Sequence, residues 1–332
     1  MFRVIWCTFL EPIKPAIGKP KTTIPFMTAL TASLEQMSTT QRAYFELHIA
    51  AFLWGFTAIL GDLIQLSALP LVWWRVLMTS ISLLFFLKGG KEIFKLSRKT
   101  ILQFAFVGVL TGLHWLTFFG AIKLANASIT LVCMATCAFM TAIIEPLVLR
   151  TRIKWWEIFI GFLVVPGMVL IVENVDVSMH TGIWVGLLSA FLASVFSILN
   201  KKWIRNAATT SITFIEMTSA WLVLTLILPF SIQADPGAAL MPSLKDFILL
   251  LVLAIACTTF AWVLALKALQ HVSAFASTLT MNLEPVYGIF LAIIILNEHQ
   301  ELSPGFYWGV LLILAVVFSY PFLNKIMKRK EV

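Results

Sequence analysis

Ten apolar segments of near-spanning length constrain the fold of this sequence more than any other feature. An α-helix needs about 20 residues to cross the hydrocarbon core of a bilayer. The segments cover residues 47–68, 70–87, 101–122, 127–149, 155–172, 181–200, 211–231, 245–268, 272–296 and 304–323. The loops between them are too short for a soluble domain. Only 12% of the residues are charged, against about 25% in soluble domains. The sequence therefore predicts an all-α integral membrane protein with ten transmembrane helices.

The basic residues are sorted between alternate loops. If the N-terminus is cytoplasmic, both tails and the loops 88–100, 150–154, 201–205 and 267–271 hold 21 of the 24 Lys and Arg residues. The opposite loops carry Asp and Glu instead. This asymmetry follows the positive-inside rule, so we predict a multi-pass protein of the cell inner (plasma) membrane with both termini cytoplasmic. It also explains the net charge of +8 without a nucleic-acid partner.

The chain divides into a tail and two similar halves. Residues 1–45 are rich in Pro and Lys, and we interpret them as an N-terminal extension, disordered or arising from a mis-assigned start before Met37. The first repeat is expected at 46–173, the second at 181–324, and a basic cytoplasmic tail at 325–332. Five spans are an odd number, so the second half enters the membrane with the opposite orientation, which predicts two inverted five-helix repeats.

Short motifs recur in the two halves and resemble those of a known family. GAIKLANASIT at 120–130 echoes LALKALQHVSAF at 264–275. The other motifs are Trp54-Gly55, Pro70 with Arg75, Ala121-x-Lys123 before Ala127-Ser128, Ala265-x-Lys267 before Ser273-Ala274, and Leu-Asn-Glu298. With these motifs the chain resembles the EamA-type transporters of the drug/metabolite transporter superfamily over about residues 46–324.

The resemblance implies a bundle of two inverted five-helix halves that moves small metabolites by alternating access through a central cavity. Because the halves are fused, no oligomer is required. One departure is Met140, which stands where the family often has Pro in the fourth span. No Gly-rich phosphate loop, HExxH motif or Ser nucleophile with a nearby loop His is present, so we predict no enzyme and no cofactor. Cys133 and Cys137 lack a His partner, so no metal site is predicted.

Glu284 is the only formal charge in the span 272–296, and Pro285 follows it directly. An ionised carboxylate in hydrocarbon costs several kcal/mol, so such groups usually face a bundle interior or a wet cavity. The residues on its helical face are Ser273, Ser277, Thr280 and Gly288, with Tyr287 beside them. We predict that this polar stripe lines a cavity, with Thr280 and Tyr287 supporting Glu284. The alternative is a protonated Glu that hydrogen-bonds a neighbouring helix.

Two further acids near helix ends are more ambiguous. Aligning the halves on Ser128 and Ser273 places Met140 opposite Pro285, so the pair Glu145-Pro146 is not expected to be the repeat equivalent of Glu284-Pro285. An interfacial ion pair with the nearby arginines is the simpler interpretation of Glu145. Glu216 lies close to the predicted cytoplasmic boundary of its span and allows either a structural or a functional role.

The other predicted cavity residues also have two interpretations each. Arg75 suits a substrate carboxylate or phosphate because its planar fork binds anions bidentately, or it pairs with Asp62 or snorkels outward. His114 suits a proton relay, or it hydrogen-bonds a facing helix as a neutral ring. Three mid-span tryptophans either stack on a substrate or fill core volume: they are Trp54, Trp115 and Trp262.

Together these features predict a secondary-active or facilitative transporter that exports small metabolites such as amino acids, with protons as a candidate coupling ion. Two alternatives remain open: an integral membrane enzyme acting on lipid-linked substrates, and a non-transporting membrane scaffold or sensor. An enzyme would need a cluster of His, Asp or Glu at one membrane face, whereas the sequence shows scattered single residues.

Overall fold

The computed structural model describes residues 37–85, 91–234, 237, 239–297 and 303–330. The predicted extension before Met37 lies outside these residues, as does Glu298. The chain divides by its contacts into the units Met1–Arg42 and Ala43–Val332, and everything below concerns the second unit. Its described residues are almost entirely helical and contain no strand, so the all-α prediction is confirmed.

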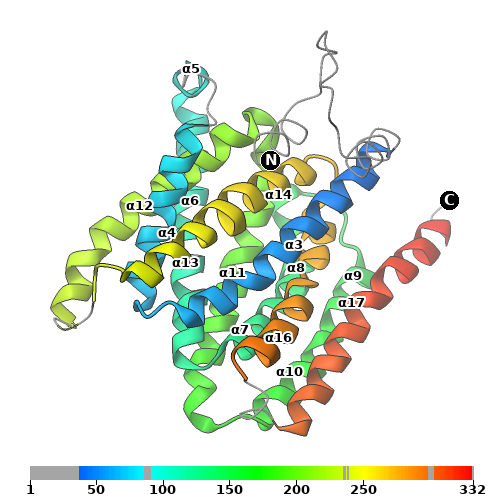
Figure 1. Ribbon diagram of the computed structural model, residues 1–332. Coiled ribbons are helices and arrows are strands. Elements are labelled where there is room, and N and C mark those ends of the chain that lie inside the picture. Colours follow the sequence, from blue (N-terminus) through cyan, green and yellow to red (C-terminus); the bar gives the residue numbers. More distant parts are fainter. Residues whose placement is uncertain (1–36, 86–90, 235–236, 238, 298–302, 331–332) are drawn as a thin grey trace, which may run out of the picture. The chain divides into compact units, whose positions relative to one another are not determined.

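Helices coincide with all ten predicted apolar segments (Figure 1). The long elements are α3 (Thr39–Leu63), α4 (Ala68–Leu84), α6 (Arg98–Leu124), α7 (Ala127–Ala135), α8 (Cys137–Leu149), α9 (Trp155–Phe162), α10 (Val164–Glu173), α11 (His180–Trp203), α12 (Thr209–Ala234), α13 (Leu244–Ala254), α14 (Ala261–Leu269), α15 (Ala274–Met281), α16 (Glu284–Ile295) and α17 (Pro304–Lys330). Short elements are α5 (Lys91–Phe94), η1 (Val177–Met179), η2 (Ile204–Asn206) and the π-helix η3 (Ile255–Phe260).

Seven helical stretches of the described chain are long and apolar enough to cross a membrane, and three shorter apolar ones accompany them. The shorter ones are Ala68–Leu84, Trp155–Ile171 and Pro304–Val316. Many large apolar side chains lie exposed, among them Phe106, Phe159, Trp184, Leu226 and Trp308. A water-soluble surface would bury such residues, so this distribution fits a multi-pass membrane protein whose outer surface contacts lipid.

Helix α6 crosses the middle of the bundle and packs closely on α11 and α12. Gly108 and Gly112, one turn apart on α6, allow the approach to α12. A Cβ added at Gly108 would lie 2.3 Å from the backbone oxygen of Glu216, and one at Gly112 would lie 3.2 Å from the Cβ of Ala220. Small residues spaced by four are typical of close helix contacts in membranes.

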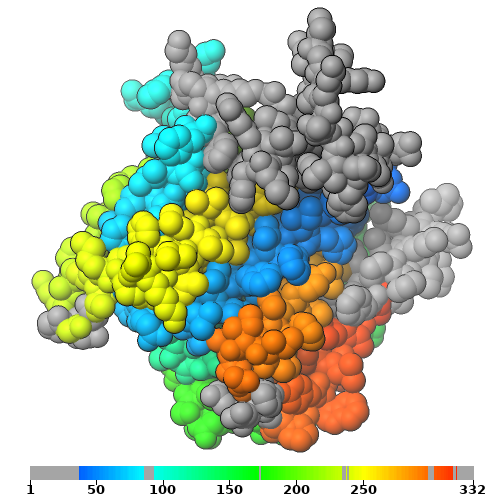
Figure 2. All heavy atoms as spheres, viewed as in Figure 1, coloured from blue at the N-terminus to red at the C-terminus, as the bar shows by residue number. Residues whose placement is uncertain are grey.

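Helix α3 lies between η3 and α16, and Figure 2 shows its blue surface between yellow and orange ones. On one side, the Trp54 indole Nε1 donates a hydrogen bond of 2.9 Å to the Cys257 carbonyl. On the other, a Cβ added at Gly55 would come within 2.8 Å of the Tyr287 Cβ. The first predicted half thus packs on the second through side chains in mid-helix.

Candidate functional site

The helical segment that carries Glu284 is broken in the middle. Helix α15 ends at Met281 and α16 begins at Glu284, so Asn282 and Leu283 form a turn between them. Pro285 stands in the first turn of α16, where its missing N–H is tolerated. Glu284 therefore lies at the N-terminal end of a helix, whose dipole favours a negative charge.

The same break occurs in the first half of the chain. Asn126 caps α7 by accepting a hydrogen bond from the Ile129 N–H, as Ser273 caps α15 through the Ala276 N–H. The following helix begins eleven residues after the cap in each half, at Cys137 and at Glu284. The expected alignment of Ser128 with Ser273, which set Met140 opposite Pro285, was therefore wrong by two residues.

The reason for the error is that the cap, and not the shared Ser, fixes where each helix starts. With the caps aligned, Cys137 is the equivalent of Glu284, and Ala138 of Pro285. In this alignment too, Glu145 is not the repeat equivalent of Glu284. Near this pair of breaks the two halves also touch, because the Asn282 amide donates a hydrogen bond of 3.1 Å to the Ala135 carbonyl.

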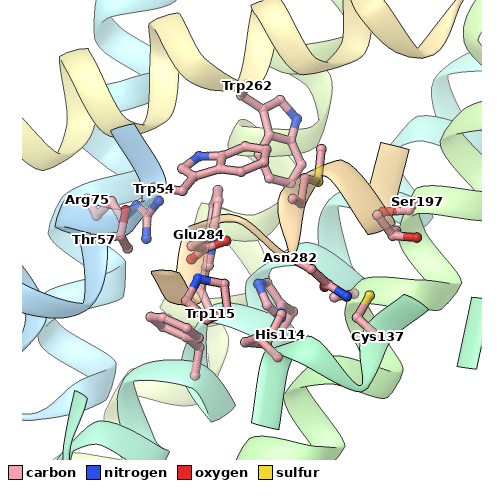
Figure 3. Close-up of a pocket in the computed structure, with 16 residues that line it drawn as sticks. Trp54, Thr57, Arg75, His114, Trp115, Cys137, Ser197, Trp262, Asn282 and Glu284 are labelled. Carbon is pink, nitrogen blue, oxygen red and sulfur yellow. The ribbon is translucent and has the colours of Figure 1, made fainter. Parts of the chain in front are cut away.

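A cavity of about 70 Å³ lies between the two breaks (Figure 3). It is lined by Trp54, Thr57, Arg75, His114, Trp115, Phe118, Met134, Cys137, Ala193, Ser197, Trp262, Thr278, Met281, Asn282, Glu284 and Pro285. A single water needs about 10–15 Å³ of such space, so several waters or a small polar group fit here. Both halves of the chain contribute to its wall.

Arg75 is the one cation among these lining residues, and it is 1% exposed. Its Nε donates a hydrogen bond of 2.7 Å to the Thr258 hydroxyl, and its guanidinium carbon lies 4.2 Å from the centroid of the Trp115 ring. Its Nη1 has no hydrogen-bond partner among the described residues. Glu284 lines the same cavity, and no ion pair within 4.0 Å joins it to Arg75 among the described residues. A buried guanidinium with a spare donor is suited to hold an anion.

The π-helix η3 places the groups that hold Arg75 and Trp54. A π-helix bonds each N–H to the fifth preceding carbonyl, which shifts the normal ladder and often occurs at functional sites. Here the Cys257 carbonyl accepts from Trp54, and the Thr258 hydroxyl accepts from Arg75. The Thr258 hydroxyl in turn donates to the Leu253 carbonyl at 2.7 Å. The second half of the chain thereby positions two residues of the first half.

Aromatic rings form the rest of the wall. Trp262 lies 5.9 Å from Trp54 and 5.2 Å from Trp115, measured between ring centroids, in edge-to-face arrangements. His114 is turned towards α11, where its Nδ1 lies 3.0 Å from the Ser189 carbonyl oxygen and 2.9 Å from the Ser189 hydroxyl. This geometry engages one ring nitrogen of His114 with the facing helix.

The sequence matches the model of a known protein family in both halves of the chain. The model of the "EamA-like transporter family" matches residues 41–173 and 180–327, one copy in each half. The chain belongs to the EamA-like transporter family. The family is part of the drug/metabolite transporter superfamily, so the expected resemblance is confirmed, and the members of this family are generally transporters.

A comparison of folds finds a similar solved structure. A solved structure described only as "Crystal structure of protein" has a TM-score of 0.64 and 14% sequence identity, over 86% of this chain and 98% of that chain. Identity this low shows a shared fold alone. No curated protein matches the chain significantly.

Within this EamA-like fold, six of the eight predicted cavity residues line the cavity: Trp54, Arg75, His114, Trp115, Trp262 and Glu284. Thr280 and Tyr287 are not among the lining residues. The Thr280 hydroxyl donates to the Ala276 carbonyl at 2.8 Å, and the Tyr287 ring packs on Phe52 with centroids 5.4 Å apart. The expected polar stripe does not form one face of a single helix, because the break after Met281 changes the helical phase.

Several cavity residues were missed from the sequence. Asn282 and Cys137 line the cavity, and Thr258 holds Arg75 from behind the wall. None of the three belongs to a motif, and each acquires its role from a local break or bulge in a helix. Glu145 was also misjudged, because it accepts hydrogen bonds of 3.0 and 2.7 Å from the backbone N–H groups of Ala274 and Phe275. It therefore caps α15 across the two halves.

The bond between Thr258 and Arg75 gives a testable prediction. Replacing Thr258 with Val keeps the shape but removes the acceptor, and hydrogen bonds to charged groups contribute about 1.5–3 kcal/mol. We expect the KM for an exchanged solute to rise about tenfold or more, and Thr258→Ser to restore it.

Thr259→Val is the matched control for this experiment. Thr259 is equally buried in the same π-helix, but its hydroxyl bonds the Ala254 carbonyl and Ser82. An equal rise in KM for both Val variants would show that η3 acts only as packing and not by holding Arg75.

Proposed function

We propose that this EamA-like protein is a secondary-active or facilitative transporter that exports small metabolites, such as amino acids, across the inner membrane by alternating access through the cavity. The observation that carries the proposal is that Arg75, which is buried and has a spare donor, and Glu284 line one aromatic-walled cavity. Burying unpaired charges is costly, so a ligand that satisfies both groups would bind with a clear energetic advantage.

The chemistry of the two groups indicates the type of ligand. A carboxylate suits the planar fork of Arg75, and an ammonium group suits the Glu284 carboxylate. The indole rings of Trp54, Trp115 and Trp262 offer apolar surface for the rest of the molecule. A zwitterionic amino acid carries all three features, and this complementarity supports the proposed substrate class.

We also propose the topology that alternating access requires. It has ten spans in two inverted halves, 46–173 and 181–324, with cytoplasmic termini. The alternate sorting of basic loops supports this orientation. The matching caps and breaks in the two halves support their equivalence. In inverted-repeat transporters, broken helices meet at a central substrate site.

The decisive test is counterflow in proteoliposomes across a panel of amino acids and related metabolites. Wild-type protein should exchange at least one of them, and Glu284→Gln should lower that exchange about tenfold or more, because a charge-assisted hydrogen bond is lost. The same vesicles under an imposed pH gradient test protons as the coupling ion.

Thr280→Val serves as the control for Glu284→Gln. Thr280 lies in the same broken segment, but its hydroxyl bonds only within its own helix, so exchange should be unchanged. If no solute exchanges, or if Glu284→Gln exchanges as well as the wild type, the proposed function of this cavity fails.

A further inference from the structure

A second buried acid lies directly behind the cavity wall. Glu216 of α12 is fully buried, and its Oε2 accepts a hydrogen bond of 2.9 Å from the Trp262 indole Nε1. Its Oε1 has no hydrogen-bond partner in the described part of the chain. The Asn200 side chain of α11 also approaches this carboxyl group. Glu216 is not a lining residue of the central cavity, but it bonds the lining residue Trp262.

Trp262 is a wall shared by two cavities. A smaller cavity of about 30 Å³ shares Trp54, Ser197, Trp262 and Met281 with the central one. It continues to Asn200 and to Leu269, near the ends of α11 and α14 that carry Lys201 and Lys267. Figure 3 shows the Trp262 nitrogen directed away from Trp54 and the central cavity. The indole therefore forms part of the wall that the two cavities share, and its nitrogen is bonded to Glu216.

Glu216 has little freedom to release the indole by moving away. Gly108 of α6 packs directly against the backbone of Glu216. A Cβ added at Gly108 would lie 2.7 Å from the Cα of Glu216. Of the titratable groups on the helices packed against α12, Arg75 bonds Thr258, His114 bonds Ser189, and Lys267 pairs with Glu46 at 3.2 Å. None of these groups is bonded to Glu216, whose carboxyl group is held by the Trp262 indole, with the Asn200 side chain beside it.

We propose that Glu216 is a positioning residue that holds Trp262 in the wall shared by the two cavities, where the indole separates one cavity from the other. Movement of a solute from the central cavity towards the end of the bundle at Lys201 and Lys267 then requires this hydrogen bond to break. This inference rests on the proposed transport function, because a barrier at Trp262 matters only if a solute moves through the bundle. The barrier itself is testable without any transported solute.

The native Cys137 thiol reports on the barrier, because it lines the central cavity. Sealed vesicles are treated with a membrane-impermeant methanethiosulfonate on each face in turn, and labelling is resolved by peptide mass spectrometry. From the face that carries Lys201 and Lys267, Glu216→Leu should label Cys137 about fivefold faster than the wild type, as expected for one lost hydrogen bond. Trp262→Phe should do the same, and the double variant should add nothing.

Two controls separate this role from simple packing. Glu216→Gln keeps an acceptor oxygen for the indole, so it should label Cys137 at the wild-type rate. Cys133 is fully buried and is not a lining residue of either cavity, so its labelling should not change. The proposal is overturned if Glu216→Leu leaves the Cys137 rate unchanged, or if Cys133 labelling rises in parallel. Accelerated Cys137 labelling without solute exchange would support the barrier while rejecting the transport function.

Discussion

Arg75→Ala should abolish counterflow of any carboxylate-bearing solute that the wild-type protein exchanges. Arg75 is the cation among the lining residues of the cavity, and its Nη1 has no hydrogen-bond partner in the described part of the chain. Arg75 and the carboxylate of the bound solute would form a buried, hydrogen-bonded charge pair. Removing one partner of such a pair costs about 2–5 kcal/mol, which lowers kcat/KM by roughly 30-fold to several thousandfold. Radiolabelled exchange in proteoliposomes measures this loss.

Arg75→Lys separates charge from geometry in the same assay. Lysine keeps the positive charge but lacks the planar fork and the Nε that bonds Thr258, so we expect only partial recovery of exchange. Exchange at the wild-type level would show that the fork is not needed and that Arg75 contributes charge alone.

The stability of Arg75→Ala should change much less than its activity. The desolvation of Arg75 is only partly offset by Thr258 and the Trp115 ring. Removing the buried charge recovers this desolvation cost, and the recovery opposes the cost of the lost contacts and of the space left behind. The variant should therefore elute as folded protein with an unfolding temperature near that of the wild type. A large fall in that temperature would mean that the lost exchange reflects misfolding.

The positions of the helices were predictable because they follow from the bilayer itself. A segment that must satisfy its backbone within hydrocarbon has to be helical, so apolar length alone located the helices that coincide with the ten predicted segments. The interruptions were not predictable in the same way. Nothing in IACTTF marks a π-helix, because its bulge is stabilised by contacts from Trp54 and Arg75, about 180 to 200 residues away in sequence.

The candidate site was predictable in its charges and large rings but not in its geometry. Arg75, His114 and Glu284 stand out because polar groups are costly in an apolar span. Thr280 was placed on the wrong face because a continuous helix was assumed through Asn282. Glu216 was undervalued because its distance from the helix end suggested an interface, whereas tertiary packing buries it completely.

Gly108→Ala should produce the largest loss of stability among the substitutions considered. The added Cβ would lie 2.3 Å from the Glu216 backbone oxygen and 2.7 Å from its Cα. Backbone atoms cannot rotate away as a side chain can, so α6 and α12 must separate along their contact. Overpacking costs about 1–3 kcal/mol when side chains can adjust, and we expect the upper end of that range or more.

Thermal unfolding of the purified protein in detergent measures this effect, with Gly120→Ala as the matched control. At about 2–4 °C per kcal/mol, Gly108→Ala should lower the unfolding temperature by roughly 6–12 °C. Gly120 lies on the same helix, but a Cβ there would meet only the Val185 Cγ1 at 3.7 Å, and Ala is favoured over Gly within a helix by about 1 kcal/mol. Gly120→Ala should therefore be neutral or stabilising, and equal destabilisation by both would show that α6 does not depend on close approach at Gly108. Because the displaced backbone belongs to Glu216, Gly108→Ala should also loosen the hold on Trp262 and accelerate the labelling of Cys137.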